Sequence, residues 1–340
     1  MRFRDSVLWP LTLPYGAVTH LRARAYRKGI LKQRRLDGVV ISVGNITVGG
    51  TGKTPMVLWL TERLLSDGKN VGILTRGYRG QPSGGEARGN AVDESTSDEV
   101  QLLKARLSGH VAFGVGADRF ERGQALAQRG VRWFILDDGF QHLQLARDVD
   151  IVLIDATNPF GGGQLLPGGR LRESRTALAR ADVIVITRST HAPALEAAIR
   201  RDSEAPIFYA RAEFESAAAP FHPHLTENDA RRAKLFAFCG IGNPSAFIAD
   251  LRDWNFQLAG HKYFPDHHRY SARDIAGIEQ EAKAAGANGV ICTEKDSFNY
   301  KGLWHSTNLW VCSISLRIDR EDDFWRTVMQ MVEGRRTVEG

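Results

Sequence analysis

Lys53 and Thr54 end a glycine-rich segment with the residue types needed to bind nucleotide phosphates. The segment follows an apolar, β-branched run at Val39–Val43 and precedes an amphipathic stretch that begins at Pro55. In such a strand–loop–helix unit, backbone N–H groups converge on phosphate oxygens, the lysine reaches the β- and γ-phosphates, and the hydroxyl holds Mg²⁺. We therefore expect a nucleoside triphosphate to be bound by Thr47, Val48, Gly49, Gly50, Thr51, Gly52, Lys53 and Thr54.

Two carboxylates, Asp137 and Asp138, follow the hydrophobic run that begins at Trp133. In P-loop proteins a strand of this kind delivers an aspartate to the Mg²⁺ shell. Asp137 could instead cap a turn, and the run Ile151–Asp155 has the same form and competes for the metal role. Gln141 and His142 come shortly after the first pair, at the strand end where ligands bind in α/β sheets.

Two further sites combine groups that could move a proton. Asp98 and Glu99 open a predicted helix, where an acidic pair could also simply interact with the helix dipole. His267 and His268 precede a second predicted helix. Because adjacent histidines point in different directions, we do not expect both to chelate one metal, but one could act as a base or orient one. A plain loop pair is the alternative.

Arginines follow several predicted strands. Arg76 and Arg119 lie directly after strand-like runs, and Arg170 and Arg172 lie in a glycine-containing loop. Guanidinium groups form forked hydrogen bonds that suit phosphates. Any one of them could be a surface charge, but several at one sheet edge indicate a highly anionic ligand.

The composition is that of an ordinary globular protein, with 340 residues, 43% hydrophobic and 25% charged. Its cysteines, Cys239, Cys292 and Cys312, are far apart and form no CxxC motif. We expect buried thiols in a reducing compartment, and the sequence offers no zinc-ligand spacing.

A basic segment at residues 22–35 contains no acidic residue and follows an apolar, aromatic stretch at residues 7–18. Pro10 and Pro14 interrupt this stretch, which is shorter than the roughly 20 residues that span a bilayer. An apolar face beside cations predicts a membrane-surface anchor. A signal peptide would need a cleaner cleavage site, and nucleic-acid binding would need interleaved aromatics or a recognition motif.

Strand-like runs alternate with helix-like runs, which predicts an α/β fold with a mostly parallel, P-loop NTPase-like sheet flanked by helices. The strand-like runs are Val39–Val43, Val71–Thr75, Val111–Gly114, Trp133–Asp137, Ile151–Asp155, Val183–Thr187, Leu235–Cys239, Gln257–Gly260, Gly289–Thr293 and Leu309–Ile314. The predicted helices are Pro55–Leu65, Asp98–Leu107, Asp118–Arg129, Leu171–Ala181, Pro244–Trp254, one opened by Ser271, and Asp322–Met331. We expect a membrane-associated segment at 1–35, a P-loop domain at 36–215, and a smaller α/β domain at 216–340 that closes over a cleft.

Taken in order, the motifs resemble those of the tetraacyldisaccharide 4′-kinase (lipid A 4′-kinase) family over nearly the whole chain. The motifs are Gly44–Pro55, Thr75–Tyr78, Asp98-Glu99, Asp137–His142, Leu166–Glu173, Asp266–His268 and Thr293–Asp296. The resemblance implies transfer of the ATP γ-phosphate to the 4′-hydroxyl of a tetraacylated glucosamine disaccharide 1-phosphate, at the cytoplasmic face of the bacterial inner membrane. It also implies two α/β lobes that close on the substrate.

The resemblance also implies roles for individual residues. Lys53 and the loop amides would bind ATP, and Asp98 would accept the hydroxyl proton, paired with His267 or His268. Mg²⁺ would be held by Thr54 and a carboxylate from Asp137, Asp138 or Glu173. The expected substrate-binding residues are Asn45, Arg76, Arg119, Gln141, His142, Arg170 and Arg172.

A P-loop GTPase and a membrane adaptor are the two alternatives to a kinase. A P-loop GTPase acting as a switch or chaperone needs a Lys-x-Asp guanine motif, but Lys295 and Asp296 are adjacent. A non-catalytic membrane adaptor is disfavoured by the intact Lys53 and Thr54 and the acidic motifs. We expect the lipid substrate and the membrane surface as partners, with no nucleic acid and no obligate protein partner evident. Whether the N-terminus spans the membrane or lies on it is left open.

Overall fold

The computed structural model describes residues 11–77, 97–107, 109–300, 302–304 and 308–339. In these ranges the strands are β1 (Val39–Asn45), β2 (Val71–Thr75), β3 (Ala112–Val115), β4 (Trp133–Asp137), β5 (Val149–Asp155), β6 (Val183–Thr187), β7 (Ile207–Ala218), β8 (Lys234–Cys239), β9 (Gln257–Tyr263), β10 (Gly289–Thr293) and β11 (Leu309–Ile318). They form one sheet in the order β3-β2-β4-β1-β5-β6-β7-β11-β10-β8-β9. The pairs are parallel except β7 with β11, so the predicted mostly parallel α/β sheet is confirmed.

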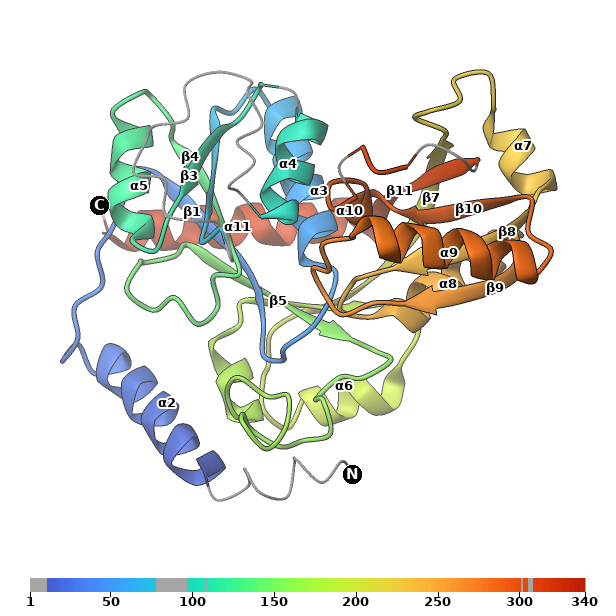
Figure 1. Cartoon of the computed structure of the whole chain (residues 1–340). Helices are drawn as coiled ribbons and strands as arrows, with labels where there is room; N and C mark the ends of the chain where they lie inside the picture. Colours follow the sequence, from blue (N-terminus) through green and yellow to red (C-terminus); the bar gives the residue numbers. More distant parts are fainter. Residues whose placement is uncertain (1–10, 78–96, 108, 301, 305–307, 340) are drawn as a thin grey trace.

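Helices accompany the strands along the described chain (Figure 1). They are α2 (Thr12–Arg27), α3 (Lys53–Ser66), α4 (Asp98–Leu107), α5 (Arg119–Ala127), α6 (Pro193–Ile199), α7 (Glu227–Arg232), α8 (Pro244–Asp253), α9 (Ala272–Ala284), α10 (Glu294–Ser297), α11 (Glu321–Glu339) and a 3₁₀ helix at Arg175–Arg180. This 3₁₀ helix replaces the longer helix predicted over Leu171–Ala181. Leu171 cannot join it, because its N–H donates to Gln164 O and it pairs with Thr47 of the P-loop.

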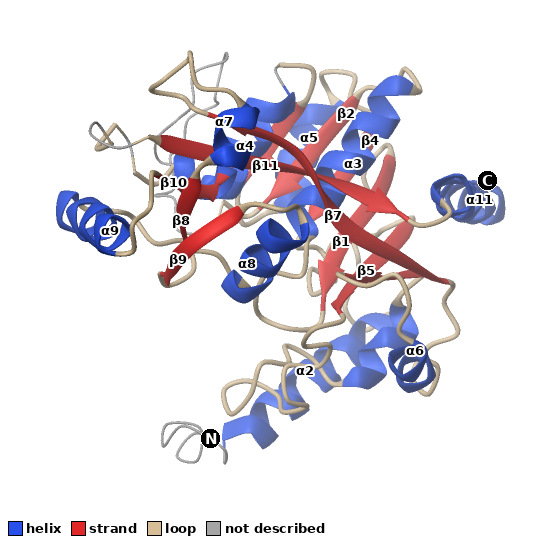
Figure 2. Cartoon of the chain, turned by 90° about the vertical axis from the view of Figure 1, so that its right-hand side faces the viewer, coloured by secondary structure: helices blue, strands red, loops and turns tan. Residues whose placement is uncertain are grey.

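The central strands are buried on both faces, which explains their almost continuous apolar sequences. Along β1, Ile41 packs with residues of α3 and α4 in one cluster, whereas its neighbour Val40 packs with Leu126 of α5 in another. In register, Ile41 lies between Ile135 of β4 and Val149 of β5. Helices therefore cover both sides of the sheet, as Figure 2 shows. The buried carboxyl end of β1, paired on both sides, positions the loop that follows it.

Two long antiparallel strands, β7 and β11, join the two halves of the sheet. The boundary expected at residue 215 falls inside β7, which the sequence analysis did not identify as a strand. After β11 the chain returns to the first half, where Phe324 and Val328 of α11 pack in the same cluster as Ile41. The 216–340 segment therefore supplies a helix to the core of the P-loop half.

Helix α2 lies at the edge of the molecule (Figure 1). Tyr15 Oη donates a hydrogen bond to Arg172 O at 3.0 Å, which ties the helix to the loop after β5. Leu13, Val18 and Leu21 are exposed. Among the described residues no helix is long and apolar enough to cross a membrane. The expected N-terminal apolar stretch lies partly in residues 1–10, outside the described residues, as does Tyr78 of the Thr75–Tyr78 motif.

Candidate functional site

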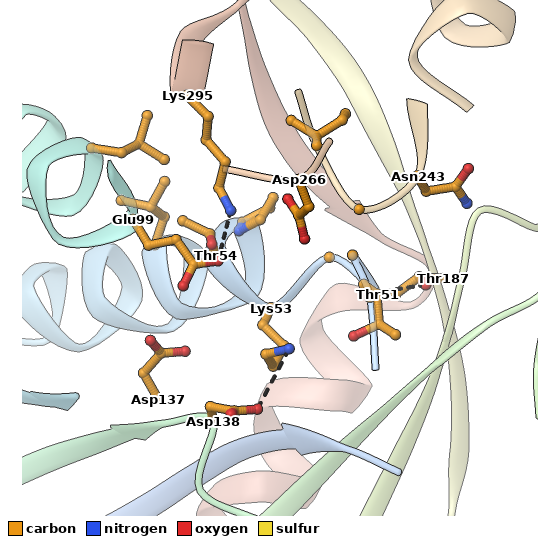
Figure 3. Close-up of a pocket in the computed structure, with 18 of the residues that line it drawn as sticks. Thr51, Lys53, Thr54, Glu99, Asp137, Asp138, Thr187, Asn243, Asp266 and Lys295 are labelled. Atoms are coloured by element: carbon orange, nitrogen blue, oxygen red, sulfur yellow. Dashed lines mark hydrogen bonds and ion pairs between the residues drawn. The ribbon is translucent and has the colours of Figure 1, made fainter. Parts of the chain in front are cut away.

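A cavity of about 820 Å³ lies where the carboxyl ends of the β1, β2 and β4 strands meet residues from the second half of the chain. The P-loop from Val48 to Thr54 lines it together with Asp137 and Asp138. His267 and Lys295 line the same cavity, although they follow β9 and β10. Figure 3 shows Lys53, Asp138 and Lys295 around this cavity, on elements from both halves of the chain.

The conformation of the P-loop is fixed by Gly52 and by hydrogen bonds to Thr51. Gly52 has a φ of +88°, a left-handed conformation that suits glycine, and α3 begins directly after it. No side chain caps this first turn of α3, so its amides face the cavity without an internal acceptor. Asn45 donates to Thr51 Oγ1 at 2.9 Å, and Thr187 of β6 donates to Thr51 O at 3.0 Å. The loop is thereby preorganised for an anion.

The Leu166–Glu173 motif lies against the P-loop. Val48 N donates to Arg170 O at 2.8 Å, and the Arg170 guanidinium donates to Val48 O at 2.9 Å. Arg172 N donates to Ile46 O at 2.8 Å, and its side chain reaches Asp138 at 2.8 Å. Arg172 lines the cavity, whereas Arg170 serves to hold the loop.

The two adjacent aspartates differ sharply in their electrostatics. Burial would raise the pKa of Asp138, but the nearby charges of Lys53 and Arg172 outweigh this and lower it. Lys53 Nζ lies 3.5 Å from Asp138 Oδ1. Asp137 is also buried, and burial together with the charges of Glu99 and Asp138 raises its pKa to about 7. Of the two aspartates, Asp138 is therefore the one whose charge is paired with neighbouring cations.

This donor set fits Mg²⁺. Hydroxyl and carboxylate oxygens are the ligands that this ion prefers, and it is usually held by one or two carboxylates plus substrate phosphates. Among the described residues no group of three or more histidine, cysteine or acidic side chains could hold a metal ion alone. Thr54, Asp137 and Asp138 all line the cavity, so a bound nucleotide could complete the set. Burial and the nearby charges of Glu99 and Asp138 raise the pKa of Asp137, and a divalent cation bound there would favour its ionised form.

Asp98 and His267 meet across the two halves of the chain. His267 Nδ1 lies 2.8 and 2.9 Å from the two Asp98 carboxylate oxygens. The hydrogen bond with Asp98 raises the pKa of His267 despite the opposing effect of burial. His268 instead lies 3.2 Å from Asp274 and stacks on Phe264. Of the two histidines left open by the sequence, His267 is thus the one that contacts Asp98.

The Asp98 side chain is only 4% exposed and is not among the residues that line the cavity. His267, which is 28% exposed, lies on the cavity wall. Of this pair, His267 is therefore the residue whose side chain meets the cavity, while Asp98 lies behind it. The cause is the start of α4, which turns Asp98 toward the second half of the chain.

A second cross-half contact lies beside this pair. Lys295 Nζ lies 2.7 Å from Glu99 Oε1, and Asn299 Nδ2 donates to Asp98 Oδ2 at 3.2 Å. In the sequence, Lys295 belongs to the Thr293–Asp296 motif but was given no role at the site, and Asn299 was not among the candidate residues. A signal was available for Lys295, because it lies in the charged run Glu294–Asp296 directly after the apolar β10.

Cationic groups line the wall near α5. Arg119 is buried, and its Nη1 lies 3.4 Å from His142 Nδ1. Burial and the charges of Arg119 and other arginines lower the pKa of His142 to about 4. Arg119 Nε and His142 Nε2 are buried with no hydrogen-bond partner. Arg76, and Arg22 from α2, line the same cavity. The arrangement can accept an anionic group.

Several predicted residues support the site rather than line its cavity. Asn45 and Thr47 lie beneath or beside the P-loop, and Glu173 accepts from Gln141 at 3.1 Å and from Arg180 at 2.9 Å. Asp155, the rival for the metal role, accepts from Arg188, Asn243 and Thr157. Gln141, in contrast, lines the cavity.

Comparison with known proteins shows the family of this chain. Residues 4–333 match the LpxK family, described as Tetraacyldisaccharide-1-P 4'-kinase. The chain belongs to this family. A tetraacyldisaccharide 4'-kinase of Desulfotalea psychrophila is 38% identical over 311 residues, covering 86% of each chain. One from Geobacter metallireducens is 40% identical over 303 residues, covering 86% of this chain and 87% of the relative.

A solved structure extends the comparison to three dimensions. LpxK from Aquifex aeolicus, crystallised in complex with ATP, superimposes with a TM-score of 0.73 at 30% sequence identity. The match covers 97% of this chain and 100% of that chain. The LpxK-family fold therefore extends over both halves of the chain.

Proposed function

We propose that this LpxK-family protein is an ATP-dependent kinase that phosphorylates the 4′-hydroxyl of a tetraacylated glucosamine disaccharide 1-phosphate in lipid A biosynthesis. One observation carries the proposal: a single cavity is lined by the P-loop lysine, Lys53, and by His267 of a carboxylate–imidazole pair. Phosphoryl transfer needs alignment and charge neutralisation more than covalent chemistry, and this cavity offers both. The names of the relatives do not favour the GTPase alternative.

ATP would bind with its phosphates on the P-loop amides. Lys53, at the first position of α3, would neutralise charge that develops on the transferring group. Thr54, Asp137 and Asp138 would hold Mg²⁺, which neutralises phosphate charge when it is bound. Glu173 serves this arrangement indirectly, because its carboxylate holds the Gln141 side chain.

The acceptor hydroxyl would lose its proton to the Asp98–His267 pair acting as a unit. His267 faces the cavity, and Asp98 fixes its ring through Nδ1. Such a pair resembles the base–orienter arrangement of other group-transfer enzymes, in which a carboxylate stabilises the imidazolium. His268 has no place in this step, because it contacts Asp274.

The acceptor carries a phosphate of its own. The cavity wall formed by the cations Arg22, Arg76 and Arg119 and by the neutral ring of His142 is suited to it, because Arg119 and His142 each have a buried nitrogen without a hydrogen-bond partner. Arg22 lies on α2, so the same helix would join this wall to a membrane surface. We place the enzyme at the cytoplasmic face of the inner membrane, on lipid. We also propose that the two halves joined by β7 and β11 move relative to one another around the cavity.

The test is transfer of labelled γ-phosphate from ATP to the purified lipid acceptor in detergent, with soluble sugars as control acceptors. Lys53→Ala should reduce turnover by about a hundredfold or more, because one transition-state charge donor is lost. Unchanged unfolding temperature would show that the variant folds. Label on soluble sugars in preference to the lipid, or near-normal turnover in the folded Lys53 variant, would refute the proposal.

A further inference from the structure

The segment that follows β10 is fixed from within by a buried carboxylate. Asp296 is 1% exposed and accepts hydrogen bonds from Gly240 N at 2.8 Å, Tyr270 Oη at 2.7 Å and Thr293 Oγ1 at 2.5 Å. Thr293 in turn caps α10 by accepting from Asp296 N. A buried carboxylate with three donors is expensive to rearrange. The residues that flank Asp296 are therefore held in one position.

Asp296 is also connected to the backbone of His267 through Gly240. It binds the N–H of Gly240, and the Gly240 carbonyl accepts from His267 N at 3.0 Å. His267 has a φ of +59°, an uncommon conformation for a residue with a side chain. The backbone that carries His267 is thus fixed from the same point as α10.

This fixed segment projects two donors toward adjacent carboxylates of α4. Lys295 contacts Glu99, and Asn299, one helical turn later, contacts Asp98. Asn299 Nδ2 also lies 3.5 Å from Lys295 O, so the two donors belong to one unit. Figure 3 shows Lys295 extended toward Glu99 at the edge of the cavity. Both contacts join the halves of the chain beside the cavity.

Charge supports a role beyond joining the halves. Burial lowers the pKa of Lys295, but the carboxylates of Glu99 and Asp98 outweigh this and raise it, so the amine stays charged. Lys295 is the largest influence on Glu99, whose pKa it lowers. Without the Lys295 amine, Glu99 would lose its strongest cationic partner. Its negative charge would still act on Asp137.

We propose that Lys295 and Asn299 are positioning residues for the phosphoryl transfer: they hold Glu99 and Asp98 in place, so that the Asp98–His267 pair is aligned only when the two halves are engaged. This inference rests on the proposed function, since it assigns a role within that reaction. Neither residue lies in the P-loop, so ATP binding should depend on them far less than turnover does.

The test compares Lys295→Met, Lys295→Arg and Asn299→Leu with the parent, using ATP and the lipid acceptor. Losing a hydrogen bond to a charged group should lower kcat about tenfold or more in Lys295→Met and Asn299→Leu, with a smaller change in the KM for ATP. Lys295→Arg keeps the charge and should exceed Lys295→Met in kcat. Should Lys295→Met fail to fold, Asn299→Leu and Lys295→Arg still decide the matter.

Glu294→Gln is the matched control. It removes the charge of Glu294 and so weakens the neighbouring ion pair between Arg106 of α4 and α10, while Arg106 keeps its contact with Glu215 and the carboxylates of Asp98 and Glu99 are unchanged. This variant should lose stability but keep kcat near the parent value. Equal losses of kcat in Glu294→Gln and Lys295→Met would show that Lys295 only connects the two halves of the chain. That result would overturn the proposal.

A double-mutant cycle gives the sharper outcome. Adding Glu99→Gln to Lys295→Met removes the unpaired carboxylate, so the double variant should regain part of the kcat lost in Lys295→Met. Additive losses would contradict the pairing. The two proposals fail separately: a parent enzyme that does not phosphorylate the lipid refutes the proposed function, whereas an active parent with unchanged Lys295 and Asn299 variants refutes only the positioning role.

Discussion

Gly242, in the second half of the chain, lies directly over Gly50 of the P-loop. A Cβ atom added to Gly242 would lie 2.3 Å from Gly50 N and 3.0 Å from Gly50 Cα. Both neighbours are backbone atoms, so no side-chain rotation could relieve the contact. The next residue, Asn243, donates to Asp155 Oδ2 at 2.9 Å, which holds Gly242 at this position. The second half thus covers the loop that would bind the phosphates.

Gly242→Ala should therefore push the second half away from the P-loop. We expect a lower kcat and a higher KM for ATP, because the cavity walls no longer meet at their closest point. Gly277→Ala, in α9, is the matched control: an added Cβ there meets only Lys262 Nζ at 3.6 Å. Steady-state kinetics of both variants provide the check. Parent-like kinetics in Gly242→Ala would mean that this contact is not needed for turnover.

Local patterns predicted several of the strands and helices around this site with the bounds that the structure shows. The bounds of β2, β4, β6, β10 and α4 are those expected from the sequence, because long apolar runs and a helix-start acidic pair determine them locally. The phosphate loop was equally clear, since strand, glycines and Lys53 follow in order. Local signals of this kind do not depend on the rest of the fold.

Long-range pairing was harder to predict. The first four residues of β7 are buried, whereas Arg211 is exposed and Ala212 is partly buried, so no single burial pattern runs through the strand. Its partner β11 lies about 100 residues away in the sequence. Asn299 and Gly242 gain their roles only when the halves meet, so no local pattern marks them. The choice of His267 over His268 likewise depended on which ring reaches Asp98.

The Asp98–His267 pair predicts a particular pH dependence. The hydrogen bond with Asp98 raises the pKa of His267 above its usual 6.5, so the ring becomes neutral only at higher pH. If the neutral ring accepts the proton, kcat should rise with pH, and the midpoint of this acidic limb should lie above pH 6.5. Asp98→Asn removes the carboxylate that raises the pKa of His267, so the limb should move to lower pH and kcat should fall.

The measurement is a pH–rate profile at saturating ATP and lipid. His267→Gln should abolish the limb, whereas His268→Gln should keep it, because His268 contacts Asp274 and not Asp98. A limb that stays in place in Asp98→Asn would show that a different group titrates.

Asp137 predicts a trade between stability and activity. Its pKa is raised from 3.8 to about 7, so the folded state favours the protonated form. Any stabilisation that the protonated carboxyl gives is therefore lost as pH rises toward 7, and the ionised group destabilises the fold above that pH. Asp137→Asn should raise the unfolding temperature by about 2 °C or more at pH 8, with a smaller gain near pH 5. Kinase activity should fall, because a proposed Mg²⁺ ligand is lost.

Asp155→Asn is the contrasting variant. Asp155 accepts from Arg188 and Asn243, so its charge is paired and its replacement should lower the unfolding temperature. Thermal unfolding of both variants across pH, without nucleotide, tests the argument. A lower unfolding temperature for Asp137→Asn at pH 8 would mean that the carboxylate is compensated in the free protein.

Helix α2 predicts how the protein contacts lipid. Leu13 is 72% exposed, and Val18 and Leu21 are each 63% exposed, whereas Tyr15 faces the body of the protein and binds Arg172 O. Exposed basic residues follow on the same segment, including Arg24 and Arg27. An apolar face beside cations binds anionic membranes through two additive attractions.

Leu13→Glu combined with Leu21→Glu should therefore weaken flotation with vesicles of phosphatidylglycerol and phosphatidylethanolamine, and leave the affinity for ATP unchanged. Each basic residue near the surface contributes about 1 kcal/mol, so high salt should release part of the parent protein. Release should be incomplete, because salt does not screen the apolar contact. Leu303→Glu, at an exposed leucine of the second half, is the matched control and should float like the parent. Equal flotation of the α2 variant and the parent would place the membrane contact elsewhere on the protein, with the lipid-binding cavity as the next surface to test.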